Sequence, residues 1–201
     1  WSLCAILLLA GLFVTPLFTL KSINIKSEFY FIEKTKVEEK LAVLMGKSTI
    51  FCKLFRSVEK ELQEFYQLES MHVDITGFHS IEVTLIERNV WMSTLIDEKS
   101  MFIDKEGFVL DLKNNSKGIE NDKIFIVKGL DDSSFNDNRL NSVLLEQFQY
   151  YEELFKSYFP NQTLLLEKTD YFSWELLLDD SIRIQLGDLE QLHDKFERIC
   201  Y

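Results

Sequence analysis

The sequence predicts an α+β protein with a transmembrane helix at its N-terminal end. Three observations support this: a charge-free apolar run over residues 1–20, helical and strand periodicities after it, and only two prolines and seven glycines. With 201 residues, 46% of them hydrophobic, the chain can bury one medium core or two small ones. We therefore expect a transmembrane anchor (1–20), a β-α-α-β-β domain (21–89) and a β-rich domain with flanking helices (90–201).

The anchor prediction rests on length and composition. Residues 1–20 carry no charged side chain, and as a helix they would cover about 30 Å, the thickness of a bilayer's hydrocarbon core. A cleavable signal peptide is the alternative, but Thr15–Lys21 offers no small-x-small cleavage site. We expect an uncleaved span surrounded by membrane lipid.

The first domain is predicted from apolar residues that recur with helical or strand spacing. In chain order, the expected elements are a strand at 23–25, helices opening at Thr35 and Ser57, and strands at 71–75 and 81–85. Thr35 and Glu38 have the spacing of a capping box. Residues 50–55 are expected to be an apolar connection. Each element has one apolar face, which favours two helices packed on one side of a small sheet.

The second domain is predicted in the same way. The expected elements are strands at 91–96, 101–103, 108–112 and 124–127, a helix at 139–159, strands at 163–166, 172–178 and 182–186, and a helix opening at Asp188. The long helix is supported by an apolar stripe that runs from Leu140 to Tyr158. Polar residues 114–122 are expected to form a loop.

The net charge and the cysteine spacing argue against nucleic-acid binding and against a CxxC-type site. The net charge of −11 is carried wholly after residue 20, and such a surface repels nucleic acid. Cys4, Cys52 and Cys200 lie far apart without a CxxC pair, so they are expected to act as small apolar groups. A Cys52–Cys200 disulfide stays an open alternative.

The sequence contains no catalytic pattern. HExxH, G-x-S-x-G, P-loop and G-x-G-x-x-G motifs are missing, and His72, His79 and His193 are expected to be surface polar residues rather than metal ligands. The pairs Asp131-Asp132 and Asp179-Asp180 raise the alternative of an envelope hydrolase. Adjacent carboxylates point apart, however, whereas glycoside hydrolysis needs two that face one sugar about 5–10 Å apart. We expect both pairs to be turn residues.

Short motifs in the chain resemble those of known families. The β-α-α-β-β order behind an anchor resembles a POTRA domain, a fold that docks polypeptides along a sheet edge. Further along, the motifs are similar to those of the FtsQ/DivIB family of bacterial cell-division proteins. The motif residues, which we take as candidate interaction residues, are Glu87, Arg88, Asp104, Gly107, Gly129, Trp174, Leu186 and Gly187. Val90 and Phe125 stand where the family usually has proline, and Asp180-Ser181 where a turn glycine is common.

The resemblance implies a non-enzymatic, single-pass scaffold of the bacterial divisome. It places the chain in the cytoplasmic membrane with its bulk outside the cytoplasm, and it implies no cofactor, metal or small-molecule substrate. The implied partners are FtsB/FtsL-like proteins, with FtsW/FtsI-like proteins as further candidates. The family's partner-binding strand follows the last helix, and this chain stops before it, so the interaction surface is left open. A POTRA-containing translocation or envelope-assembly factor is the alternative, and Glu87-Arg88 has a second interpretation as a structural ion pair.

Overall fold

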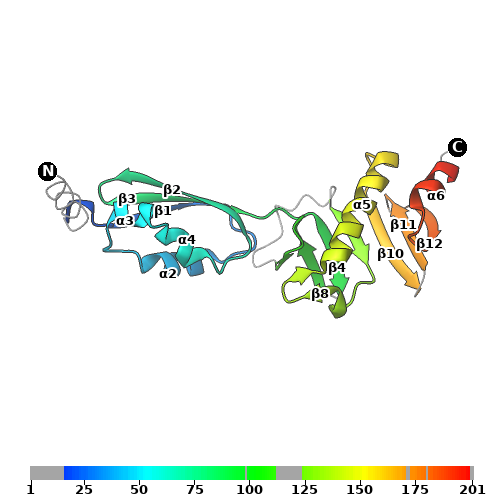
Figure 1. Cartoon of the computed structure of the whole chain (residues 1–201), viewed down its shortest axis with the longest axis horizontal. Helices are drawn as coiled ribbons and strands as arrows, with labels where there is room; N and C mark the ends of the chain where they lie inside the picture. The colour runs from blue at the N-terminus through cyan, green and yellow to red at the C-terminus, as the bar shows by residue number, and fades with distance from the viewer. Residues whose placement is uncertain (1–15, 98, 112–123, 171–172, 180, 200–201) are drawn as a thin grey trace, which may run out of the picture. The chain divides into compact units, whose positions relative to one another are not determined.

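The computed structural model describes residues 16–97, 99–111, 124–170, 173–179 and 181–199 (Figure 1). They form two compact units, with the division between Arg88 and Asn89. Both units mix helices and strands, which confirms the α+β class. The predicted anchor falls mostly in residues 1–15, outside the described part, and no helix within that part is long and apolar enough to span a bilayer.

The first unit is built on a three-stranded sheet. Its strands are β1 (Ser22–Lys26), β2 (Leu68–Gly77) and β3 (Ser80–Glu87), in the order β1-β3-β2. The central strand β3 runs parallel to β1 and antiparallel to β2. Its alternate residues Ile81, Val83 and Leu85 are buried, as predicted from their spacing.

Three helices cover one face of this sheet (Figure 1). They are α2 (Lys34–Ala42), α3 (Thr49–Leu54) and α4 (Ser57–Leu62). The predicted β-α-α-β-β order is confirmed, with one addition: the connection expected at residues 50–55 is a helix, α3. Ser48 begins it as an N-cap whose side chain accepts from the Phe51 N–H.

Both predicted helix caps in this unit are wrong, Thr35 by two residues and Ser57 by one. Helix α2 begins at Lys34, with Glu33 at the N-cap position and without a side-chain capping bond, so the Thr35 box is not used. Helix α4 follows Arg56, which adopts a left-handed backbone conformation with φ 50°, so Ser57 is already helical. Tertiary packing of Val37 and Val58, both fully buried, decides these starts.

Leu20 belongs to the core of the first unit. It is 1% exposed, its N–H donates to the Lys47 carbonyl, and its own carbonyl accepts from the Gly46 N–H. Before it, the 3₁₀ turn η1 (Pro16–Phe18) leads to Thr19, which forms a bridge with Ser48. The residues just before position 21, which the sequence placed in the anchor, therefore pack with the folded unit.

The second unit is built on a seven-stranded sheet. Its strands are β4 (Met92–Ile96), β5 (Lys99–Ile103), β6 (Val109–Leu110), β7 (Phe125–Lys128), β10 (Leu164–Asp170), β11 (Ser173–Leu178) and β12 (Ile182–Gly187). The order is β12-β11-β10-β7-β4-β5-β6. Strand β7 is parallel to both of its neighbours, and the remaining pairs are antiparallel. The loop predicted at 114–122 lies outside the described residues.

Helices α5 (Ser142–Tyr158) and α6 (Leu192–Ile199) complete the second unit. Helix α5 lies between the parallel strands β7 and β10 in the chain, which is the usual crossover position. It starts three residues later than predicted, because β9 (Arg139–Leu140) pairs with β8 (Phe135–Asn136) and Asn141 then caps the helix. Helix α6 starts at Leu192, four residues after the predicted Asp188.

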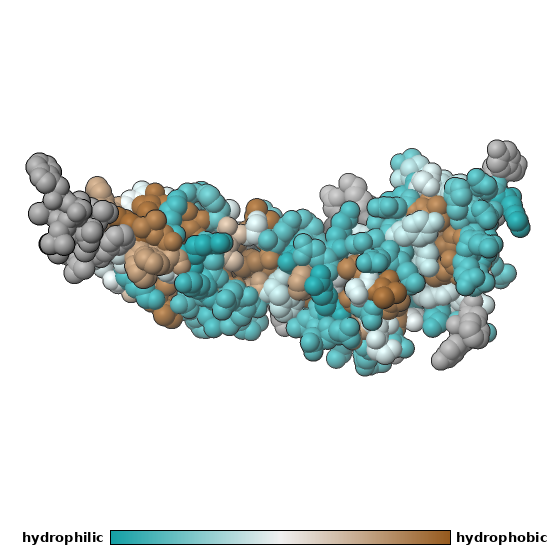
Figure 2. Space-filling view, in the orientation of Figure 1, coloured by the Kyte–Doolittle hydropathy of each residue, from teal (hydrophilic) through white to brown (hydrophobic). Residues whose placement is uncertain are grey.

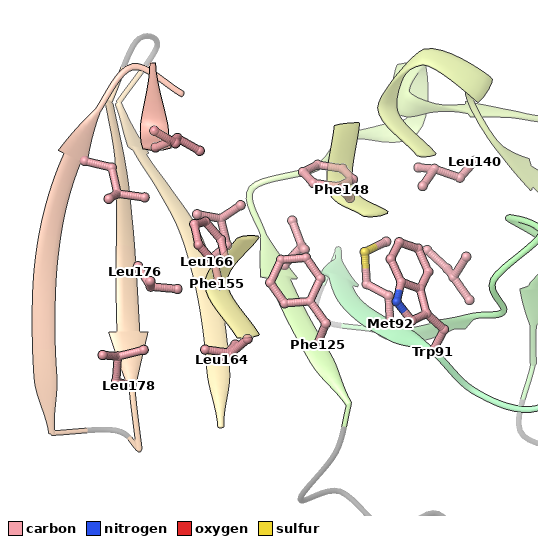
Figure 3. Close-up of a cluster of buried hydrophobic side chains, with 14 of the residues drawn as sticks. Trp91, Met92, Phe125, Leu140, Phe148, Phe155, Leu164, Leu166, Leu176 and Leu178 are labelled. Carbon is pink, nitrogen blue, oxygen red and sulfur yellow. The ribbon is translucent and has the colours of Figure 1, made fainter. Parts of the chain in front are cut away.

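The core of this unit joins α5 and α6 to the sheet. Figure 3 shows the α5 side chains Phe148 and Phe155 among buried side chains of the sheet. Phe155 of α5 meets Phe125 of β7 and Phe196 of α6 at ring-centroid distances of 6.2 and 5.5 Å. The stripe predicted on α5 is confirmed at Phe148 and Phe155, but Val143 at the helix start is exposed.

Candidate interaction site

The carboxylate of Glu87 binds the backbone of a neighbouring connection. Its Oε2 accepts from the N–H groups of Tyr30 (2.8 Å) and Phe31 (3.0 Å), and its Oε1 accepts from the Ile32 N–H (2.9 Å). Glu87 is 8% exposed, and burial of a carboxylate is costly unless hydrogen bonds compensate. Three consecutive N–H groups do so, and they fasten the segment between β1 and α2 to the end of β3.

Arg88 fastens a second connection to the same strand end. Its Nε donates to the Tyr66 carbonyl at 2.7 Å, and its backbone N–H donates to the Gln67 carbonyl at 2.8 Å. Glu87 and Arg88 thus hold the connections on either side of the helical layer. From the sequence, the Glu87-Arg88 pair was interpreted either as an interaction site or as an ion pair. Neither interpretation included these contacts with the backbone.

Asp104 and Gly107 form a tight turn between β5 and β6. The Asp104 Oδ1 accepts from the N–H groups of Glu106 (3.0 Å) and Phe108 (2.7 Å), and its carbonyl accepts from the Gly107 N–H. Gly107 has φ +89°, a conformation in which residues with a Cβ are strained. Its carbonyl accepts from the Leu140 N–H, so the turn also holds the β8–β9 hairpin.

The remaining motif residues lie around β10, β11 and β12. Gly129 has φ +92°, and a Cβ on it would come within 2.6 Å of the Lys168 Cβ. Trp174 is paired with Gly187 across β11 and β12, and its ring meets Phe148 edge to face at 6.4 Å. Leu186 is buried in the core. The motif positions therefore form separate groups that shape turns and packing.

A buried glutamate joins α5 to the start of the sheet, and sequence reasoning missed it. Glu152 is 5% exposed, and its Oε2 accepts from the indole N–H of Trp91 at 2.6 Å. Its Oε1 binds the Lys156 ammonium one helical turn away. The available signal was that Glu152 follows the buried Phe148 by four positions, on the core face of the helix. A buried tryptophan also needs an acceptor for its N–H.

The first unit has edge strands at β1 and β2, and a groove lies beside β1. Strand β1 ends the sheet, and a groove of about 360 Å³ lies between it and α2. The lining residues are Ile23, Asn24, Ile25, Lys34, Glu38, Leu41, Ala42 and Met45. Its chemistry is an apolar floor with charged groups from α2 beside a strand edge, which suits an extended polypeptide.

The second unit presents an open edge at β12. This strand is six residues long and ends the described sheet on one side, while the opposite edge strand β6 has two residues. Ile182 is 52% exposed at its start, whereas Leu186 is buried near its end. A long edge strand with an exposed branched side chain can pair with another strand.

Asp131 and Asp179, which were considered as catalytic carboxylates, form hydrogen bonds within turns. Hydrogen bonds from the hydroxyls of Ser133 and Ser134 hold the pKa of Asp131 below its usual value, and this carboxylate caps the 3₁₀ turn η3 (Asp132–Ser134). Asp179 accepts from the Thr163 N–H at 2.8 Å in a turn. Asp180 lies outside the described residues. In the ranges that the structure describes, no three His, Cys, Asp or Glu side chains gather into a metal site.

The three histidines have polar contacts within the chain, and Cys52 is buried. His79 contacts the Thr19 carbonyl through Nδ1 at 2.9 Å, and His193 contacts the Tyr158 hydroxyl at 3.1 Å. His72 lies 3.2 Å from the Asp74 carboxylate. Cys52 is fully buried in the first core, and burial raises the pKa of its thiol.

Comparison with known proteins identifies the second unit. The model of a family described as cell division protein FtsQ/DivIB, C-terminal, matches residues 94–200, more than half of the chain. This range contains six of the eight motif residues, while Glu87 and Arg88 precede it. No curated protein matches the sequence.

Proposed function

The chain belongs to the FtsQ/DivIB family of cell-division proteins, and from this premise we propose that it is a single-pass membrane scaffold of the bacterial divisome. Family membership implies a role in cell division without enzymatic activity. The proposal adds that both units lie outside the cytoplasm and bind other division proteins during septum formation. The family match over residues 94–200 carries it.

The proposed attachment is the apolar segment 1–20, the end of which leaves the proposed span through the 3₁₀ turn Pro16–Phe18. Its charge-free composition favours insertion, and Leu20 joins the first core directly. A POTRA-like unit, 21–89, would then begin at the bilayer surface, and the family domain, 90–201, would follow it.

The proposed partners are FtsB/FtsL-like proteins, with FtsW/FtsI-like proteins as further candidates. Strand addition is the proposed binding mode, because main-chain hydrogen bonds supply affinity along an open edge and alternate side chains supply specificity. Strand β12 supports this mode in the second unit, and β1 with its groove supports it in the first. The partner-binding strand that the resemblance places after the last helix is distinct from β12, so we propose the β12 edge as an additional contact for the FtsB/FtsL-like partner.

Depletion in the source organism tests the cellular role. Loss of a divisome scaffold leaves growth intact but blocks septation, so cells should become filamentous or fail to separate. The readout is cell length by microscopy, with re-expression of the full-length gene as the control. Normal division after clean deletion would count against the proposal.

Capture from membranes tests the partner class. The full-length protein, solubilised with its membrane partners, should co-purify with FtsB/FtsL-like proteins, identified by mass spectrometry. Co-purification with an outer-membrane barrel protein instead would favour the translocation alternative. The control is the same purification carried out with protein that has no affinity tag.

A further inference from the structure

The first unit exposes a group of large apolar side chains where η1 meets α3 and the β2–β3 turn. The group, which we call the α3 face, consists of Leu17, Phe51, Leu54, Phe55 and Phe78. Leu54 and Phe78 are more than 60% exposed. Figure 2 shows hydrophobic residues gathered at the η1 end of this unit. A soluble surface rarely exposes so many large apolar groups together without a binding function.

Ring contacts and one hydrogen bond hold the segments of this surface together. The rings of Phe51 and Phe55 stack at 4.3 Å, and the rings of Phe18 and Phe78 meet edge to face at 5.7 Å. The hydroxyl of Thr49, in the first turn of α3, donates to the Phe78 carbonyl at 3.3 Å. The α3 face therefore spans three segments that are held together.

Helix α3 carries apolar side chains on its exposed side as well as on its buried side. Thr49 and Cys52 point into the first core and are fully buried. Phe51, Leu54 and Phe55 point away from it, so burial in the unit does not explain them. An amphipathic helix would carry polar residues there.

The segment that contains α3 is rich in basic residues, three of which form surface ion pairs: Lys40 with Glu64, Lys53 with Asp74 and Arg56 with Glu59. Between Glu39 and Glu59 the chain has no acidic residue and four basic ones, Lys40, Lys47, Lys53 and Arg56. This is unusual in a chain of net charge −11. Residues 21–88 hold 11 acidic and 10 basic side chains, whereas residues 89–201 hold 22 and 12, so the negative charge lies almost wholly in the second unit.

The composition suits one partner, a lipid bilayer surface. Aromatic and leucine side chains bordered by lysine and arginine are typical of groups that lie in the headgroup region of a membrane with anionic lipid. The position in the chain agrees with this partner, because Leu17 and Phe18 lie at the C-terminal end of the apolar run, 1–20, that we propose as the anchor. The face is thus within a few residues of the proposed membrane entry point.

We propose that the α3 face lies in the interfacial region of the bilayer and fixes the orientation of the first unit on the membrane. This inference rests on the proposed membrane attachment. A single span followed by a folded unit leaves that unit able to pivot. Insertion of Phe51, Leu54, Phe55 and Phe78 into the headgroup region restricts the pivot and directs the β1 edge along a defined side.

Depth-dependent fluorescence tests this in the full chain. Leu54→Cys is made in a Cys4→Ser, Cys200→Ser background, in which the remaining Cys52 is buried. An environment-sensitive label is attached, and the protein is reconstituted in vesicles of phosphatidylethanolamine and phosphatidylglycerol. Ile86→Cys is the matched control: Ile86 is 51% exposed in the same unit, and six residues of strand, about 20 Å, separate it from the β2–β3 turn.

The expected result is a difference between the two positions. The label at position 54 is quenched by lipids brominated near the headgroups, and aqueous iodide quenches it about fivefold less than the label at position 86, because side chains in the interface lie about 5–10 Å below the surface. Phe78→Cys should behave as Leu54→Cys does, which guards against a folding defect in either variant.

Three other results would each contradict either the proposed membrane contact or the proposed anchor. Equal iodide quenching at positions 54 and 86 contradicts the α3 face as a membrane contact. Protection from iodide without quenching by brominated lipid also contradicts it and shows that protein covers the face. Failure of the chain to float with vesicles contradicts the proposed anchor itself, which flotation reports separately from the label.

Discussion

At the scale of single residues, Glu87 shows how a motif side chain acts through backbone contacts. Its carboxylate accepts from three consecutive N–H groups in the connection between β1 and α2. Glu87, which the sequence analysis took as a candidate interaction residue, thus has a structural role in the described residues. Whether Glu87 also contacts another division protein stays a prediction.

Glu87→Gln should destabilise the first unit. The amide keeps the shape but replaces one acceptor oxygen with a donor that faces backbone N–H groups, so we expect a loss of about 2–3 kcal/mol. Hydrogen exchange at Tyr30, Phe31 and Ile32 measures it locally in the full chain. Glu82→Gln is the control, because Glu82 pairs with Lys26 at the surface and should cost less than about 1 kcal/mol. Equal acceleration in both variants would contradict this role.

Gly129→Ala should destabilise the second unit by about 2–3 kcal/mol, because it combines a left-handed backbone with a close approach to Lys168. Gly187→Ala separates the two causes. Gly187 has φ +67° but open space around its Cβ position, so only the backbone cost of about 1 kcal/mol applies. Thermal unfolding of both variants gives the comparison, and an equal loss would show that the Lys168 contact is unimportant.

Cys52 should resist thiol reagents until the first unit unfolds. Burial raises its pKa, so at pH 8 less thiolate forms than in an exposed cysteine, and access is blocked as well. Labelling by a maleimide in the Cys4→Ser, Cys200→Ser background should be at least about a hundredfold slower than in denaturant. Rapid labelling of the folded chain would show that the first core opens at this position.

At the scale of elements, strands were easier to predict than helix ends. The alternation in β3, at Ile81, Val83 and Leu85, is a local signal that burial on one face explains. Helix α3 escaped prediction because its outward side chains, Phe51, Leu54 and Phe55, are apolar, so no stripe stood out. The caps at Thr35 and Ser57 were locally plausible, but packing of the neighbouring valines set the boundaries.

The order of the larger sheet could not be predicted from the sequence. Strand β7 pairs with β4 and β10, and both pairings join segments that are distant in the chain. The turn at Asp104–Gly107 fills the gap that the sequence left between the strands expected at 101–103 and 108–112, and its hydrogen bonds are local. The role of Glu152 depends on Trp91, 61 residues away, and no local pattern reports that contact.

Helix α5 depends on its N-cap. Asn141 accepts from the Val143 N–H at 2.9 Å, and Asn141→Ala should lower the stability of the second unit by about 1 kcal/mol. Asn141→Asp should keep most of it, because a carboxylate accepts the same bond and its charge favours a helix start. Denaturant titration of the three proteins checks this order, and equal loss in both variants would contradict the cap.

At the scale of the whole molecule, charge separates the two units. The first is nearly neutral and exposes the apolar α3 face, and the second carries almost all of the negative charge. A membrane-facing first unit and a partner-facing second unit agree with that division, since anionic lipid repels the acidic unit. Family membership makes the cell-division role firm, and the sheet edges make strand addition the proposed binding mode.

Photocrosslinking at the β12 edge tests the central claim most directly. A crosslinking amino acid is placed at position 182, on the edge strand, or at position 143, where Val143 is equally apolar and 61% exposed at the start of α5. In dividing cells, position 182 should give a product with an FtsB/FtsL-like protein and position 143 should not. A product at position 143 alone, or none at either position while the protein still supports division, would contradict partner binding at this edge.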